Sequence, residues 1–242
     1  MSHPILIVLV AVVAGSVAAL SGFGIGSILT PMFAASMGTK LAVAVVSIPH
    51  FLGTALRFVL IREQLDRRVL VTFGITSAIG GLTGALLHVW LRSQILGYLL
   101  GALLVFAGIM GITGLTQKLR FGKTTGWIAG ALSGIFGGLV GNQGGIRSAA
   151  LLGFEVSKES FIATATAIAL LVDIFRMPVY AVSQYQRLRS AWPQIVFATI
   201  GVIVGTFAGK PLLQRIPEKA YRFVISLAIL LLGVWMLLHP GA

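Results

Sequence analysis

The chain of 242 residues contains no cysteine, and only six of its residues are aspartate or glutamate. Without thiols there is no disulfide, thiolate metal site or cysteine nucleophile. Its four histidines lie far apart without metal-ligand spacing, and neither a Ser/His/Asp set nor a pair of carboxylates can be assembled. We therefore expect a protein that is not an enzyme and that uses no metal and no cofactor.

Charge of either sign is also scarce. Charged residues make up 10% of the chain and hydrophobic residues 57%, whereas about a quarter of a soluble domain is charged. A helix needs about 20 apolar residues to cross the hydrocarbon core of a bilayer. The composition predicts an all-α, multi-pass integral membrane protein. About eight spans are expected, near 5–21, 41–61, 69–91, 95–115, 126–141, 160–182, 191–209 and 220–238.

The formal net charge of +12 comes from lysines and arginines scattered through short loops. We interpret them as solvated loop charges, so the expected partner is a lipid bilayer and not nucleic acid. The positive-inside rule predicts that loops 62–68, 116–125 and 183–190 face the cytoplasm. A homodimer is left open.

The chain resembles itself at a fixed offset, which indicates duplication. The offset is 119 residues at first and becomes 125 after the loop at 183–190, where Gly80 then pairs with Gly205. We predict two homologous four-span repeats, residues 1–115 and 126–242, joined by a basic connector at 116–125. The pairs at offset 119 include Gly22 with Gly141, Gly26 with Gly145, and Arg57 with Arg176.

Two glycine-rich motifs, residues 22–31 and 141–148, occupy equivalent places in the repeats. Glycines weaken a helix, and the freed backbone groups need protein, water or ligand because lipid offers no partners. The first helix of each repeat is therefore predicted to be broken or re-entrant at its motif. Whether the repeats are parallel or inverted stays open. The half-helix after each break would present unpaired N–H groups that suit an anion.

Other glycines have a structural interpretation. The spacing Gly80-x-x-x-Gly84 recurs as Gly205-x-x-x-Gly209. Small residues at this spacing let helices approach closely in lipid. We expect these four glycines to serve helix packing.

Arg147 is the strongest candidate for a binding residue because it lies well inside an apolar stretch. An arginine in the middle of a membrane helix costs roughly 2.5–3.5 kcal/mol on insertion scales, so a compensating partner is expected. The predicted substrate-binding residues surround it and its counterpart motif. They are Arg147, Asn142, Gln143, Gly144, Gly145, Ser148, Arg57, Arg176, Gly24, Gly26 and Ser27.

Polar side chains also form a matched stripe in each half. Ser47, His50, Thr54 and Arg57 share one helical face, and Thr166, Asp173 and Arg176 are their counterparts. Asp173 and Arg176 are three residues apart and can pair directly. His50, Asp173, Ser47, Thr54 and Thr166 are candidates for coupling or support. Arg57 and Arg176 either bind substrate or extend to the membrane surface.

With these motifs the chain resembles the TauE/SafE family of sulfite exporters, also called the 4-toluene sulfonate uptake permease family. The resemblance covers nearly the whole chain and includes Gly22-Phe23-Gly24-Ile25-Gly26 leading to Pro31. This chain departs from the family pattern at Ser27, at Asn142-Gln143 and at Arg147. It also has no proline at position 150.

The resemblance implies transport of a small sulfur-containing anion, such as sulfite, sulfoacetate or another sulfonate, across the cytoplasmic membrane. A secondary transporter, acting as an exporter by alternating access, is the first hypothesis. A passive anion channel with the same basic lining is the alternative. A membrane enzyme or receptor subunit is disfavoured by the scarcity of acid, histidine and thiol groups.

Overall fold

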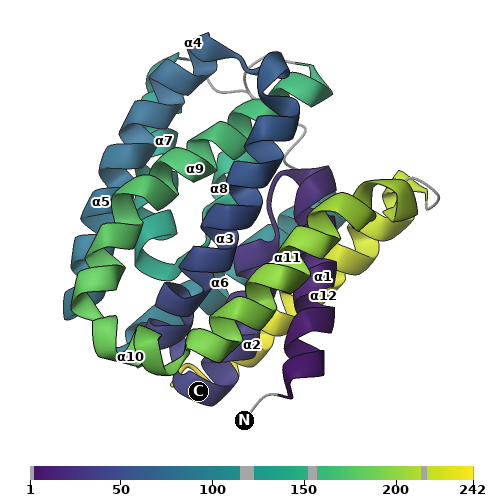
Figure 1. Ribbon diagram of the computed structural model, residues 1–242. Coiled ribbons are helices and arrows are strands. Elements are labelled where there is room, and N and C mark those ends of the chain that lie inside the picture. Colours follow the sequence, from purple (N-terminus) through teal and green to yellow (C-terminus); the bar gives the residue numbers. More distant parts are fainter. Residues whose placement is uncertain (1–2, 115–122, 152–156, 214–216, 242) are drawn as a thin grey trace.

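A computed structural model of the protein describes residues 3–114, 123–151, 157–213 and 217–241. Most of the predicted connector at 116–125 lies outside these residues, including Lys118 and Arg120. The described part is helical throughout, without a strand. The helices form one tilted bundle (Figure 1).

The first half of the chain contains five longer helices and three short segments, and the second half contains six helices. In the first half they are α1 (Pro4–Ser21), α2 (Ile25–Met37), α3 (Thr39–Ile61), the 3-10 turn η1 (Arg62–Gln64), α4 (Arg67–Val69), the π-turn η2 (Leu70–Gly74), α5 (Ile75–Trp90) and α6 (Ser93–Thr113). In the second half they are α7 (Lys123–Val140), α8 (Gly144–Leu151), α9 (Lys158–Ser183), α10 (Tyr185–Ser190), α11 (Trp192–Leu213) and α12 (Glu218–Leu238).

The two glycine-rich motifs end helices, as predicted. Gly22 follows α1 with φ 77° and Gly141 follows α7 with φ 70°. Residues with a side chain rarely adopt this left-handed conformation. In both places the next helix begins within four residues, at Ile25 and at Gly144. The sequence thus interrupts two apolar stretches where glycine permits a turn.

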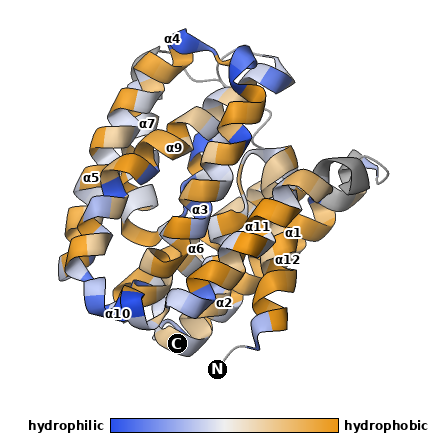
Figure 2. Ribbon diagram, viewed as in Figure 1, coloured by the Kyte–Doolittle hydropathy of each residue, from blue (hydrophilic) through white to orange (hydrophobic). Residues whose placement is uncertain are grey.

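Six helical segments in the described part are long and apolar enough to cross a membrane. Hydrophilic residues gather near α4 and α10, at the two ends of the bundle (Figure 2). The chain is therefore a multi-pass membrane protein. The two remaining predicted spans contain shorter apolar helices, Thr125–Val140 and Arg222–Leu238, so the count of eight stays a prediction. The six segments are Pro4–Ser21, Thr39–Gln64, Arg67–Trp90, Ser93–Thr113, Glu159–Ser183 and Trp192–Gly209.

The glycine pairs serve helix packing, as predicted. A Cβ added at Gly80 would lie 2.3 Å from the carbonyl oxygen of Ala131, and one at Gly84 would lie 2.1 Å from that of Ile135. These glycines let α5 run alongside α7 at backbone contact. Gly205 and Gly209 of α11 contact α1 in the same way. In both pairs residue numbers rise together along the contact, so the paired helices run parallel.

Helices α3 and α9 cross in the middle of the bundle in opposite directions. Gln184, after the end of α9, donates from Nε2 to the Lys40 carbonyl at the start of α3, over 3.1 Å. Thr164, near the start of α9, accepts from the backbone N–H of Asp66, after α3, over 3.0 Å. The loops 62–68 and 183–190 therefore lie at opposite ends of the bundle (Figure 1). The prediction that both face the cytoplasm was wrong, because it counted basic residues without knowing helix directions.

Helix directions also show how each broken segment is arranged. Because α1 runs parallel to α11, which follows α10, α1 begins at the α10 end of the bundle. Helix α3 begins at that same end, so α1 and α2 form a hairpin that enters and leaves there. Helices α7 and α9 both begin at the α4 end by the same contacts. The chain therefore turns back at each break toward the end of the bundle from which it came.

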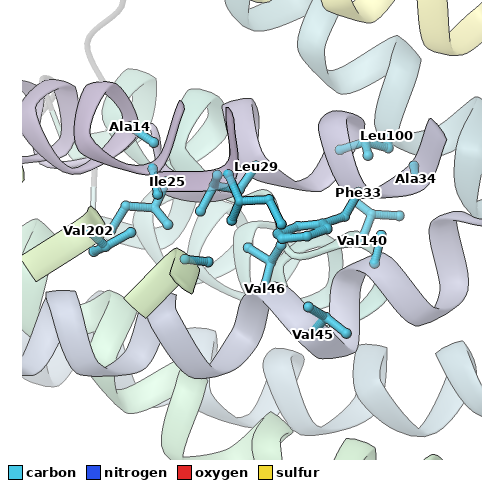
Figure 3. Packing of buried hydrophobic residues seen from close by; sticks show 14 of the residues in the cluster. Ala14, Ile25, Leu29, Phe33, Ala34, Val45, Val46, Leu100, Val140 and Val202 are labelled. Atoms are coloured by element: carbon cyan, nitrogen blue, oxygen red, sulfur yellow. The ribbon is translucent and has the colours of Figure 1, made fainter. Parts of the chain in front are cut away.

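Helix α2 lies at the centre of the apolar core. Its side chains Ile25, Leu29 and Phe33 are fully buried and pack with Val46 of α3 and Val202 of α11 (Figure 3). In lipid such packing stabilises by close van der Waals contact, because lipid tails are as apolar as the side chains. The half-helix is therefore held by protein on its apolar sides.

The helix boundaries follow the offsets seen in the sequence. Helices α7, α8 and α9 each begin 119 residues after α1, α2 and α3, and α12 begins 125 residues after α6. Homology of the two halves stays a prediction.

Candidate functional site

The two breaks meet inside the bundle. A Cβ added at Gly26 would lie 2.4 Å from the Gly141 carbonyl oxygen, and one at Gly144 would lie 2.6 Å from the Cβ of Phe23. Only glycine allows these backbones to come so close. The motifs that are 119 residues apart in sequence therefore form one place in the structure.

Asp173 lies beside this place and is fully buried. Its Oδ1 accepts from Nε of Arg176 at 2.8 Å and lies 2.7 Å from Nη2 of the same guanidinium. Its Oδ2 lies 2.6 Å from Nδ1 of His50. The predicted Asp173–Arg176 pair is thus confirmed. The ionised carboxylate can only accept, so His50 donates from Nδ1 and joins α3 to α9.

Arg57 and Arg176 each hold the end of a broken helix. Arg57 donates from Nη1 to the Ala18 carbonyl near the end of α1, and Arg176 donates from Nη1 to the Gly137 carbonyl near the end of α7, both at 2.6 Å. Positive charge is favourable at a helix C-terminus because of the helix dipole, and each guanidinium is a second donor to a carbonyl that also accepts the N–H of Gly22 or Gly141. The side chains of Arg57 and Arg176 are 3% and 2% exposed, so neither extends to the membrane surface.

Arg147 on α8 differs from the other two arginines in its unused hydrogen-bonding groups. It is 2% exposed and donates from Nη2 to the Gly22 carbonyl at 3.1 Å. Its Nε and Nη1 have no hydrogen-bond partner among the residues that the structure describes. Leaving a buried donor unpaired costs about 1–3 kcal/mol, and more for a charged group. Arg147 therefore presents two buried donor nitrogens that call for an acceptor.

The neighbouring amides share this property. Asn142 Nδ2 and Gln143 Oε1 are buried and, within the described part of the chain, have no partner. Asn142 thus adds a donor to those of Arg147, and Gln143 offers an acceptor. On the opposite motif, Thr30 Oγ1 is likewise buried without a partner in the described residues, 3.9 Å from the Cβ position of Gly141.

Of the remaining predicted residues, four lie at the starts of the half-helices that follow the breaks, and Gly145 contacts another helix. Gly24 precedes α2, and Ser27 is buried in its first turn. Gly144 begins α8, where Ser148 is half-buried. Gly145 does not approach the opposite break, since a Cβ there would meet the Cβ of Ala107 on α6 at 3.0 Å.

The supporting residues are buried on the crossing helices α3 and α9. Ser47 donates to the Ala44 carbonyl at 2.7 Å within its own helix, and Thr166 accepts from Nε of Arg57 at 3.0 Å. Thr54 Oγ1 is buried and has no partner in the described residues. The polar stripes of α3 and α9 therefore face one another, and most of their groups bind other protein groups.

Two contributors were missed from the sequence. The Tyr180 hydroxyl donates to the Gly138 carbonyl, and the guanidinium of Arg176 lies 5.9 Å from the centre of its ring. Tyr180 follows Arg176 by four residues, so helical spacing was an available signal. His88 lies 2.7 Å through Nδ1 from the Leu139 carbonyl, and no sequence pattern marked it.

The buried charges of the site do not balance. Arg57, Arg147 and Arg176 are buried with Asp173, the one acidic residue among the buried residues that the structure describes. Arg147 interacts electrostatically with Arg57 and Asp173. With His50 neutral, these four side chains leave two positive charges uncompensated. Within the described residues, no group of His, Cys, Asp or Glu could hold a metal ion. The arrangement suits an anion with several acceptor oxygens.

Comparison with protein families gave one match of nearly full length. The family model described as "Sulfite exporter TauE/SafE" matches residues 7–236. Comparisons with curated proteins and with solved structures returned no match.

Proposed function

The chain belongs to the TauE/SafE sulfite exporter family, and on that premise we propose that it is a secondary transporter that exports a small sulfur-containing oxyanion. Sulfite, sulfoacetate and related sulfonates are the candidate substrates. The anion binds inside the bundle where the breaks at 22–24 and 141–143 meet. A passive anion channel is the alternative that the experiments below separate from it.

The unpaired donors of Arg147 are the observation that carries this proposal. Its Nε and Nη1 lack partners in the described part of the structure, and Asn142 adds a third donor nitrogen. A guanidinium presents its donors in a planar fork that matches the oxygens of an oxyanion. Nε and Nη1 lie on different edges of the guanidinium, and sulfite and sulfonate groups carry three oxygens on one centre, so one anion can accept along one edge of Arg147 and from the Asn142 amide together.

Arg57 and Arg176 have a different part in the proposed site. Both donate to helix-end carbonyls. They therefore stabilise the ends of α1 and α7, and their positive charges attract the anion without direct contact. Their charges also explain why an anion is stabilised there. Two positive charges in a low-dielectric interior attract a monoanion or a dianion, and a dianion such as sulfite compensates both.

We further propose that the two halves are inverted repeats that rock against each other around this site. Equivalent helices run in opposite directions: α3 against α9, and α6 against α12, where Gly101 lies at Leu237 and Gly111 at Ser226. The two re-entrant hairpins start from opposite ends of the bundle. Such an arrangement provides one access route from each side of the membrane.

The first test is binding to purified protein in detergent. We expect sulfite or an organosulfonate to raise the melting temperature and to bind measurably by calorimetry, and Arg147→Gln to lose at least about tenfold in affinity, since one charge-assisted hydrogen bond contributes roughly 1.5–3 kcal/mol. Arg68→Gln, an exposed charge at α4, is the matched control. Unchanged affinity in Arg147→Gln would remove this residue from the binding site.

The second test separates the transporter from the channel. In proteoliposomes a transporter gives saturable uptake, and substrate trapped inside accelerates uptake of labelled substrate from outside. A channel gives an anion conductance without that acceleration. Conductance at near-diffusive rates would contradict the proposed mechanism.

A further inference from the structure

A second basic site lies away from the central one, at the α10 end of the bundle. A cavity of about 900 Å³ opens between the start of α3, the link from α5 to α6 and the end of α9. We call it the basic vestibule. Its polar lining includes Lys40, Arg92, Ser93, Ser183, Gln184 and Arg187. None of them belongs to the site at the two breaks.

The vestibule carries charge of one sign. Lys40, Arg92 and Arg187 line it, and the described residues of its wall include no acid. Lys40 is fixed in place because Nζ donates to the carbonyls of Val89 and Leu91, at 2.5 and 3.1 Å. Arg92 and Arg187 are exposed, so their guanidinium groups are accessible to a ligand. Charges of one sign in a cleft with low-dielectric walls concentrate counter-ions.

The floor of the vestibule is a buried polar link between three helices. Gln184, 6% exposed, donates from Nε2 to the Lys40 carbonyl and lies 3.3 Å from Nε2 of His88. Its Oε1 is buried and, in the part of the chain described, unpartnered. Because an amide oxygen can only accept, Oε1 suits a bound water, and the donors for an anion come from the basic side chains.

The vestibule and the central site share helix α3. Lys40 and His50 are ten residues apart, which is about 15 Å along a helix. An anion that enters the vestibule is therefore within about half a membrane thickness of the central site. Gln184 contacts the Lys40 carbonyl at the vestibule and also His88, whose Nδ1 lies 2.7 Å from the Leu139 carbonyl, two residues before the break at Gly141.

We propose that the basic vestibule is an outer binding site, at which a small oxyanion is captured on its way to or from Arg147. This inference rests on the proposed function, because it assigns the same anion a second place to bind. The occupant shares its chemistry with the phosphate of an anionic lipid headgroup, which the experiment must distinguish.

The test measures transport in vesicles of purely zwitterionic lipid with substrate on the vestibule side. The orientation is read from Gln186→Cys, since the chain has no other cysteine for an impermeant maleimide to label. We expect Arg92→Gln/Arg187→Gln to raise the KM roughly threefold to tenfold at low ionic strength, with an unchanged maximal rate. The difference should shrink as added salt screens the charges.

The matched control is Arg67→Gln/Arg68→Gln, which removes the same charge at the opposite end of the bundle. It should leave the KM on the vestibule side unchanged. Equal KM values for both double variants would overturn the proposal. An effect that appears only when anionic lipid is added would also overturn it and would assign the vestibule to lipid headgroups. The two proposals can fail independently. Unchanged binding in Arg147→Gln would contradict the proposed central site, whereas the vestibule variants leave Arg147 in place and test the outer site alone.

Discussion

Asp173→Asn tests the charge arrangement of the site most directly. Asp173 is fully buried, and its two oxygens bind His50 and Arg176. The substitution keeps the shape of the side chain but removes the single negative charge that opposes three buried arginines. Removing one partner of a buried ion pair costs about 3–5 kcal/mol, because the other charge stays behind uncompensated. We therefore expect a large loss of stability.

The assay is thermal unfolding of the purified protein in detergent. For a chain of this length, 1 kcal/mol corresponds to roughly 2–4 °C in melting temperature, so Asp173→Asn should melt on the order of 10 °C below the parent. Asp66→Asn is the control with the same chemical change. Asp66 accepts from the backbone N–H groups of Arg68 and Val69 at the start of α4, and asparagine caps a helix equally well.

A second variant identifies the cause. Asp173→Asn/Arg176→Gln removes both charges, so it should be less destabilised than the two single variants added together. If Asp173→Asn melts together with Asp66→Asn, the carboxylate does not stabilise the buried arginines. Strict additivity in the double variant would likewise refute the pairing as the source of the effect.

Two further predictions concern the breaks. Gly26→Ala should lower expression and melting temperature sharply, because its Cβ would lie 2.4 Å from the Gly141 backbone oxygen. Gly145→Ala is the control and should be tolerated better, because its nearest contact is the Cβ of Ala107 at 3.0 Å. Equal behaviour of the two variants would contradict the backbone contact. Arg57→Lys should lower the melting temperature and slow transport, since one ammonium cannot reach both Ala18 and Thr166 as the guanidinium does. The matched control is Arg62→Lys at the exposed η1 turn, and equal effects there would argue against the carbonyl cap.

Much of the fold followed from local patterns. Apolar runs of about 20 residues marked α1, α3, α6 and α9, because a helix must satisfy its own backbone to sit in lipid. Helix α2 was expected only as a half-helix after the first break, without bounds of its own. It has only 13 residues and contains Ser27, Thr30 and Pro31, so it falls below the length and hydropathy of a span. Its place in the core comes from packing against helices far away in sequence.

The candidate site was predictable in its residue types but not in its connections. Burial of Arg147 and the Asp173–Arg176 pair followed from hydropathy and helical spacing. The bond from His50 to Asp173 joins residues 123 positions apart, and sequence without alignment has no signal for such a pair. The same holds for the carbonyls of Ala18 and Gly137, since every residue has a carbonyl and no local pattern marks the one that a distant guanidinium reaches.

The sequence by itself determined that this is a helical membrane protein, where its helices break, and which buried side chains carry charge. Those properties depend on local composition, on glycine and on the cost of placing polar groups in lipid. Only the tertiary structure decided that α3 and α9 run in opposite directions, that the breaks touch, and that Arg147 has two buried donors without a partner among the described residues while Arg57 and Arg176 bind helix-end carbonyls. Each of these depends on which distant backbone atom lies within hydrogen-bonding distance, and that is set by packing of the whole bundle.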